Sequence, residues 1–223
     1  MRSRVAVSFD LFGTLVDVDR SSDPAPAVAT ALSDRGVAVP DDWASAYRER
    51  HIDAPDGAAV PLPAHVSAAL ASRGVDASGT AIRRAVVAAF DPDVETRDGA
   101  AAAVRVAASY GPVGVLSNCS VPHLVSRVLT RSAVDRDLLD ATVTSIGCGW
   151  RKPDRRAFAA AARALDAPLA DLWHVGDDPR TDGRVLDRES TADAPDAAGP
   201  NHVLLDDVSL PEFGEYMEGR AWD

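Results

Sequence analysis

Five short apolar runs, each bounded by turn-forming residues, constrain the fold of this chain more than any other feature of its sequence. The runs lie at residues 5–9, 113–117, 141–146, 172–175 and 202–205. Such runs, with few polar interruptions, are typical of strands buried on both faces of a sheet. Helical periodicity fills the spaces between the later runs, at residues 98–109, 121–131 and 154–165. Strands that alternate with helices indicate an α/β fold, in which a parallel sheet carries helices on both sides.

Residues 18–96 interrupt this alternation. The segment contains four helix-like stretches, at about 24–35, 41–53, 64–73 and 78–90, with no convincing strand between them. Proline residues separate the stretches, and the sequence AVPLP at 59–63 is the clearest loop. We therefore expect a helical insert, with the sheet built from the residues before and after it.

The net charge of the chain excludes some classes of binding partner. Asp and Glu number 34 against 23 Lys and Arg, which gives a net charge of −11. A negative field of this kind repels nucleic acid and anionic lipid, so we expect neither as a partner. The longest stretch without charged residues, 106–126, contains two prolines and two glycines and does not fit a membrane span. The N-terminus lacks a signal-peptide pattern, so the expected localisation is cytoplasmic.

The choice of charged residues is also biased, with 28 Asp to 6 Glu and 22 Arg to 1 Lys. Such a composition is typical of halophilic proteins, because dissolved salt screens the repulsion between their carboxylates. A GC-rich genome would favour the same residues, and we prefer the halophilic interpretation. The two cysteines, Cys119 and Cys148, have no zinc-binding spacing and are expected to be free thiols.

The first chemical motif is SFDLFGTLVD, in which Asp10 directly follows the first apolar run. Gly13 permits a sharp turn of the backbone beside it. Because open α/β sheets bind ligands at the carboxyl ends of their strands, Asp10 is a candidate reacting carboxylate. An Asp that ends a strand is also a common turn residue, so this motif alone leaves both interpretations open.

Two further motifs supply polar groups. GVLSNCS leaves Ser117 and Asn118 at the end of the second run, where a hydroxyl and an amide would suit a phosphoryl oxygen. The alternative is an ordinary turn in which Asn118 or Ser120 caps a helix. GWRKPDRRAF contains Lys152, whose compact charge can neutralise a phosphate oxygen or hold a carboxylate. The alternative for this lysine is a solvated helix N-terminus.

The fourth motif, HVGDDPRTD, places Asp177, Asp178 and Asp182 after the apolar run at 172–175. Three carboxylates within six residues repel one another unless a cation or an arginine compensates them. Hard oxygen ligands of this kind suit magnesium. The alternative is an acidic loop in a generally acidic chain.

In this order, the four motifs resemble those of the haloacid dehalogenase-like hydrolase superfamily, over residues 5–182. The resemblance implies a Rossmann-like parallel-sheet core with a small helical cap inserted just after the first motif. It assigns residues 1–17 and 97–223 to the core and residues 18–96 to the cap. It also implies a small phosphorylated molecule as the substrate, while the oligomeric state stays open.

The resemblance implies catalytic roles position by position. Asp10 would be the nucleophile, and Ser117 would bind the transferring group with help from Asn118. Lys152 would steady the charge of the nucleophile and of the substrate. The expected reaction is attack of the carboxylate on phosphorus to give an aspartyl phosphate, which water then hydrolyses.

The resemblance likewise implies Mg²⁺ as the cofactor. Its ligands would be Asp10, Asp177 and the backbone carbonyl of Phe12, with Asp182 or Asp178 in support. The side chain of Phe12 would lie next to the substrate.

Phe12 is also where the chain departs from the family's phosphatases, which usually carry there a second Asp that acts as general acid and base. Such proton transfer contributes about 10² to 10⁴ in rate. Family dehalogenases instead have an aromatic residue there and use no metal, whereas GDDPRTD resembles the magnesium loop of phosphatases. We therefore expect a Mg²⁺-dependent phosphohydrolase. The alternatives are a metal-independent 2-haloacid dehalogenase and a non-catalytic binding protein.

A second departure follows Asp182, where a polar loop, including residues 189–200, replaces the small-residue helix usual in the family. The sequence leaves the last part of the core open.

Overall fold

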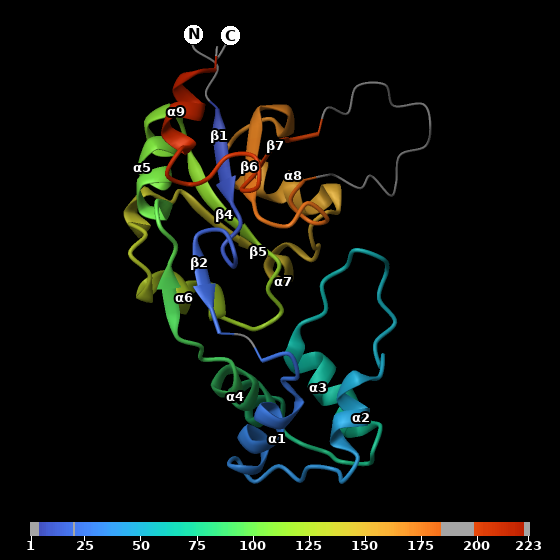
Figure 1. The fold of residues 1–223 in the computed structure, drawn as a ribbon. Helices are drawn as coiled ribbons and strands as arrows, with labels where there is room; N and C mark the ends of the chain where they lie inside the picture. The colour runs from blue at the N-terminus through green and yellow to red at the C-terminus, as the bar shows by residue number, and fades with distance from the viewer. Residues whose placement is uncertain (1–4, 20, 184–198, 221–223) are drawn as a thin grey trace, which may run out of the picture.

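A five-stranded parallel sheet forms the centre of the molecule (Figure 1). The computed structural model describes residues 5–19, 21–183 and 199–220. The strand order is β5-β4-β1-β6-β7. The strands are β1 (Ala6–Phe9), β4 (Val113–Ser117), β5 (Ala141–Thr144), β6 (Leu172–Gly176) and β7 (Asn201–Leu204). The prediction of an α/β fold with a Rossmann-like parallel sheet is confirmed.

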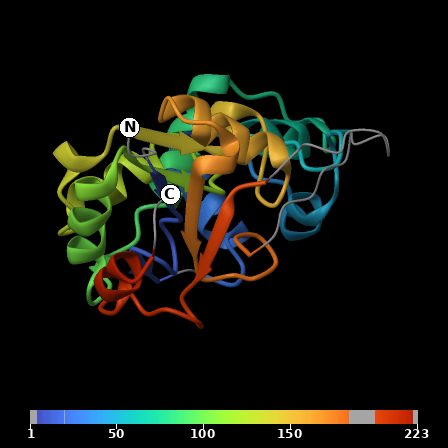
Figure 2. The ribbon, with the colours of Figure 1, turned by 90° about the horizontal axis from the view of Figure 1, so that it is seen from above.

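Helices cover both faces of this sheet. They are α5 (Ala100–Tyr110), α6 (Leu124–Arg131), α7 (Ser145–Cys148), α8 (Arg155–Ala164) and α9 (Phe213–Glu218). Side chains alternate along β1, so that Ala6 packs with α8 while Val7 and Phe9 pack into the larger core cluster on the other face. Phe9 meets Phe213 of α9 edge to face, with ring centroids 5.6 Å apart. Figure 2 shows α5 and α9 on one side of the sheet and α8 on the other.

Four helices lie beyond the carboxyl ends of the strands (Figure 1). They are α1 (Ala25–Ser33), α2 (Trp43–Arg48), α3 (Leu62–Ala71) and α4 (Gly79–Ala89). Each corresponds to one of the helix-like stretches predicted within residues 18–96. The second is shorter than predicted, because the chain leaves the helix after Arg48 and runs as a long loop to Pro61.

Between α1 and α4 the described residues contain no strand, as predicted, but two short strands lie just outside these helices. β2 (Val16–Val18) and β3 (Val94–Thr96) form an antiparallel pair in which Val16 lies opposite Thr96. Each strand has only three residues, too few for a periodic pattern to be visible in the sequence. Both connections between the sheet and α1–α4 pass through this ribbon. The division into core and cap near residues 18 and 96 stays a prediction.

Two smaller differences concern the ends of predicted elements. The run at 141–146 ends as a strand at Thr144, whose hydroxyl accepts a hydrogen bond from the Gly147 N–H (3.1 Å) and so caps α7. The predicted loop at 189–200 lies, up to residue 198, outside the described residues. Within the described part of the chain, no helix combines the length and apolar character needed to cross a membrane.

Candidate active site

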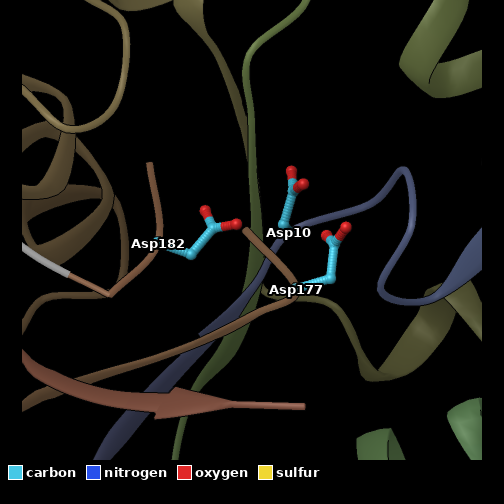
Figure 3. A group of neighbouring side chains, drawn as sticks. All are labelled: Asp10, Asp177 and Asp182. Atoms are coloured by element: carbon cyan, nitrogen blue, oxygen red, sulfur yellow. The ribbon is translucent and has the colours of Figure 1, made fainter. Parts of the chain in front are cut away.

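The carboxyl ends of three neighbouring strands place the predicted site residues together. β1 pairs with β4 and β6, so that Phe9 lies level with Val115 on one side and Val175 on the other. The residues just beyond these positions therefore collect at one edge of the sheet. Asp10, Asp177 and Asp182 each offer a carboxylate oxygen, and these atoms lie within 4.8 Å of one another. In Figure 3 the side chains of Asp177 and Asp182 flank that of Asp10.

The turn after β1 brings the backbone close to Asp177. Gly13 has a φ of +86°, a conformation that residues with a side chain rarely adopt, and a Cβ there would collide with the carboxylate of Asp177. The next residue, Thr14, donates its hydroxyl hydrogen to Asp177 Oδ1 at 2.9 Å. The glycine therefore permits the close approach, and the threonine fixes the orientation of the carboxylate. The sequence analysis did not identify Thr14 as a site residue.

Lys152 is buried in the site, with 1% of its side chain exposed. Its Nζ lies 3.0 Å from Asp10 Oδ1 and 2.6 Å from Asp182 Oδ1. A buried ammonium requires such carboxylate partners, because removal of a charge from water is costly. Lys152 is thus held against the predicted nucleophile.

Asn118 holds the backbone of Lys152. Its side-chain Oδ1 accepts a hydrogen bond from the Lys152 N–H (2.8 Å), and its Nδ2 donates to the Lys152 carbonyl oxygen (3.0 Å). We expected Asn118 to assist Ser117 in binding the substrate, whereas the structure places its amide on Lys152. Asn118 therefore acts on the site by positioning the lysine.

Asp182 is the second carboxylate partner of Lys152, and only 1% of its side chain is exposed. Its Oδ1 contacts Lys152 and accepts a hydrogen bond from His174 Nε2 (3.1 Å), and its Oδ2 accepts one from the Asp178 N–H (3.1 Å). Since both oxygens already have donors, Asp182 serves Lys152 better than it would serve a metal ion. Asp178 itself forms an ion pair with Arg180.

His174 completes the buried network from within β6, where Ser8 of β1 is its register partner. Burial, and then the charge of Lys152, lower the pKa of His174 to about 4, so the ring is neutral near pH 7. A neutral ring with its proton on Nε2 donates to Asp182 and accepts from the Ser8 hydroxyl at Nδ1 (2.9 Å). From the sequence we predicted His174 only as a strand residue. The one signal for this role was a polar residue inside an apolar run.

We predict that this buried histidine makes stability depend on pH. Because its pKa is about 4 in the folded chain against 6.5 ordinarily, the unfolded chain takes up the proton first as pH falls. The contribution to stability is complete above about pH 6.5 and is lost toward pH 4, by roughly 2 to 3 kcal/mol at about pH 4.5. Urea unfolding at about pH 7.5 and 4.5 measures how much free energy of unfolding each protein loses between the two pH values. The loss should be larger by that amount in wild type than in His174→Asn. His123→Asn, a change at an exposed histidine, should behave like wild type; equal losses in all three proteins would contradict the prediction.

Acidic and basic side chains around Asp10 are not present in equal number. Burial raises the pKa of Asp10, the charge of Lys152 opposes this, and that of Asp182 adds to it. Burial also disfavours ionisation of Asp182, but the His174 hydrogen bond and the Lys152 charge together hold its pKa below its usual range. Three carboxyl groups, Asp10, Asp177 and Asp182, thus share one lysine, so that acidic groups outnumber basic ones in the site. A divalent cation would neutralise this site.

Ser117 offers a hydrogen-bond donor that is not in use. The residue is 1% exposed at the end of β4, and its Oγ has no hydrogen-bond partner among the described residues. Buried hydroxyls are nearly always paired, so an unpaired one at the carboxyl end of β4 suits an oxygen of a bound ligand. This agrees with the role expected of Ser117.

Comparison with known proteins connects this geometry to a family. A sequence profile of the haloacid dehalogenase-like hydrolases matches residues 5–186. The chain is similar to the 2-haloacid dehalogenase from Pseudomonas syringae pv. Tomato DC3000, with 18% identity, 96% of each chain covered and a TM-score of 0.58. It is also similar to CbbY from Rhodobacter sphaeroides in complex with phosphate, with 18% identity, 94% of this chain and 96% of that chain covered, and a TM-score of 0.53. No curated protein sequence matches the chain. At these identities, the structural similarities establish the fold alone.

Proposed function

The chain belongs to the haloacid dehalogenase-like hydrolase family, and we propose that it is a magnesium-dependent phosphohydrolase of a small phosphorylated metabolite. The observation that carries this proposal is the uncompensated charge around Asp10. Three converging carboxylates face a single ammonium, and Asp177 is oriented by Thr14 rather than by a cation. A divalent ion neutralises such a site, whereas a metal-free site of this charge repels an anionic substrate.

The donor set fits magnesium, which prefers carboxylate and carbonyl oxygens. Asp10, Asp177 and the backbone carbonyl of Phe12 would hold the ion, while Asp182 is left to Lys152. When bound, the ion supplies positive charge that stabilises the negative charge on the phosphoryl oxygens.

The residues of the chain account for the rest of the reaction. A carboxylate oxygen of Asp10 attacks phosphorus, the bond from phosphorus to the leaving oxygen breaks, and its electron pair departs with that oxygen. Ser117 donates a hydrogen bond to a phosphoryl oxygen, and Lys152 offsets the charge that gathers beside Asp10. Water then attacks phosphorus in the aspartyl phosphate, the bond between phosphorus and the Asp10 oxygen breaks, and inorganic phosphate leaves with the carboxylate restored.

Phe12 and the cavity that it lines restrict the kind of leaving group that the site can release. Phe12 provides no proton for a departing oxygen. It lines a cavity of about 460 Å³ with both apolar walls, such as Phe90 and Leu124, and two acidic residues, Asp19 and Asp91. The described lining residues include no cation. Since neither Phe12 nor this lining offers a cation to a departing oxygen, we propose substrates whose leaving group departs unaided, such as aryl or acyl phosphates, rather than sugar phosphates.

A 2-haloacid dehalogenase is the second candidate. The aromatic side chain of Phe12 favours it, since halide leaves without a proton. The excess of acidic groups over basic ones around Asp10 argues against it, because the substrate of a dehalogenase carries a carboxylate of its own. Contact between Lys152 and Asp10 also argues against a protein that only binds its ligand.

Hydrolysis of an aryl phosphate, an alkyl phosphate and 2-chloropropionate, each in Mg²⁺ and in EDTA, tests the proposal. We expect activity on the aryl phosphate, little on the alkyl phosphate, and loss of both in EDTA. Activity confined to 2-chloropropionate and indifferent to EDTA would establish the dehalogenase instead.

We predict that Phe12→Asp extends the reaction to poor leaving groups. A carboxyl group two residues after Asp10 is able to protonate an alkyl leaving oxygen, so kcat for the alkyl phosphate should rise about 10²-fold. The aryl phosphate, which departs unaided, should gain little. Two carboxylates would then share the site, so the gain should require Mg²⁺.

The matched control is Phe12→Asn, which has the shape of Asp but no transferable proton. An equal gain in both variants would show that a smaller side chain, and not proton transfer, is responsible.

A further inference from the structure

A cavity with a positively charged lining lies between the α1–α4 segment and helix α6. It measures about 910 Å³ and is lined by Arg35, Arg83, Arg84 and Arg127, against one carboxylate among its described lining residues, Asp91. The local charge is thus +3 in a chain whose net charge is −11. We propose that this cavity binds a compact oxyanion of the phosphate type, at a site separate from Asp10.

The one carboxylate is already neutralised. Asp91 Oδ1 lies 3.0 Å from a guanidinium nitrogen of Arg127 and 3.0 Å from one of Arg131. Arg127 also donates to the carbonyl oxygens of Val87 (3.2 Å) and Phe90 (2.7 Å), which ties α6 to the end of α4. Because Asp91 already pairs with Arg127 and Arg131, it does not compensate the positive charge of the other arginines.

None of the remaining three arginines has a carboxylate partner among the described residues. Arg83 Nη2 lies 3.0 Å from His123 Nε2, a contact with an imidazole and not with an anion. Arg35 donates to the carbonyl oxygen of Ala31 (2.7 Å), at the end of its own helix. Arg84 forms no ion pair within the described part of the chain. Three guanidinium groups thus line one cavity without an anion.

The chemistry of the lining favours a small anion with several oxygens. Guanidinium groups bind phosphate-type oxygens through paired N–H donors, and a dianion relieves the repulsion between them. The first turn of α4, through Gly79 and Thr80, lines the same cavity and adds the positive end of the helix. A long polyanion is disfavoured because the rest of the chain is acidic.

The location implies a consequence for the whole molecule. Arg35, Arg83 and Arg84 belong to the segment of α1–α4, whereas Arg127 belongs to α6 beside the sheet. An anion held between them bridges the two parts of the chain. This inference does not depend on the reaction proposed at Asp10.

Calorimetric titration with inorganic phosphate, without Mg²⁺ and at ionic strength matched with KCl, tests the site. We expect one binding event that survives in Ser117→Ala, which weakens any phosphate binding beside Asp10. The double variant Arg83→Gln/Arg84→Gln should bind at least about tenfold more weakly, equivalent to about 1.4 kcal/mol. The control Arg105→Gln/Arg163→Gln removes the same charge from exposed positions on α5 and α8 and should bind like wild type.

A second variant, Arg35→Gln, provides an independent test from another helix and should also weaken binding. Methylphosphonate carries a similar anionic head group on carbon: binding of both anions assigns the site to phosphoryl groups of small molecules, and binding of phosphate alone assigns it to the free ion. The proposal is overturned if wild type shows no binding, if the Arg83 and Arg84 changes have no effect, or if the control loses as much affinity. It is also overturned if the wild-type cavity binds only RNA or an acidic peptide.

Discussion

Replacement of Asp10 by Asn is expected to lower kcat by at least about 10⁴-fold while the chain stays folded. The amide keeps the shape of the carboxylate but cannot attack phosphorus. Folding should be little affected, because Lys152 keeps its contact with Asp182 and because burial already disfavours the charge on Asp10. The measurements are aryl phosphate hydrolysis in Mg²⁺ and the thermal midpoint of unfolding.

Asp178→Asn is the matched control for this experiment. Asp178 lies next to Asp177 but pairs with Arg180 at the surface, so its loss should change kcat only a few-fold. If Asp10→Asn hydrolyses the substrate within a few-fold of wild type, Asp10 is not the nucleophile.

Lys152→Met is expected to cost about 10³-fold in kcat/KM and about 3–5 kcal/mol in the free energy of unfolding. Without the ammonium, Asp10 and Asp182 face each other with no cation between them. The lysine charge is also what opposes the raised pKa of Asp10, so the acid limb of the kcat/KM profile should move to higher pH. The measurements are a pH–rate profile and urea unfolding.

Arg163→Met, which removes an exposed cation from α8, is the control and should leave both quantities nearly unchanged. A Lys152→Met variant with the wild-type pH profile would show that the lysine does not govern the ionisation of Asp10.

The sequence was sufficient to predict that Asp10, Ser117 and Asp177 lie together. Each follows an apolar run, and the carboxyl ends of neighbouring parallel strands meet at one edge whatever the details of the loops. Lys152 was predictable from its chemistry, as the only lysine in the chain.

The supporting contacts were not predictable, because they depend on which loops meet in space. Asn118 and Lys152 are 34 residues apart, and no local pattern shows that the amide of one holds the backbone of the other. The short ribbon of β2 and β3 and the buried pair of Ser8 and His174 likewise depend on long-range packing. The secondary-structure propensity of a short segment carries no information about such contacts.

The group attached to Asp10 during turnover distinguishes the two candidate reactions most directly. Both require Asp10 as the nucleophile, but one attaches a phosphoryl group and the other a carboxyalkyl ester. Enzyme mixed with acetyl phosphate and Mg²⁺, quenched in acid and digested, should yield a peptide phosphorylated at Asp10, which is absent in EDTA and in Asp10→Asn. A carboxyalkyl ester on Asp10 after mixing with 2-chloropropionate, with no phosphorylation by acetyl phosphate, would contradict the proposed function.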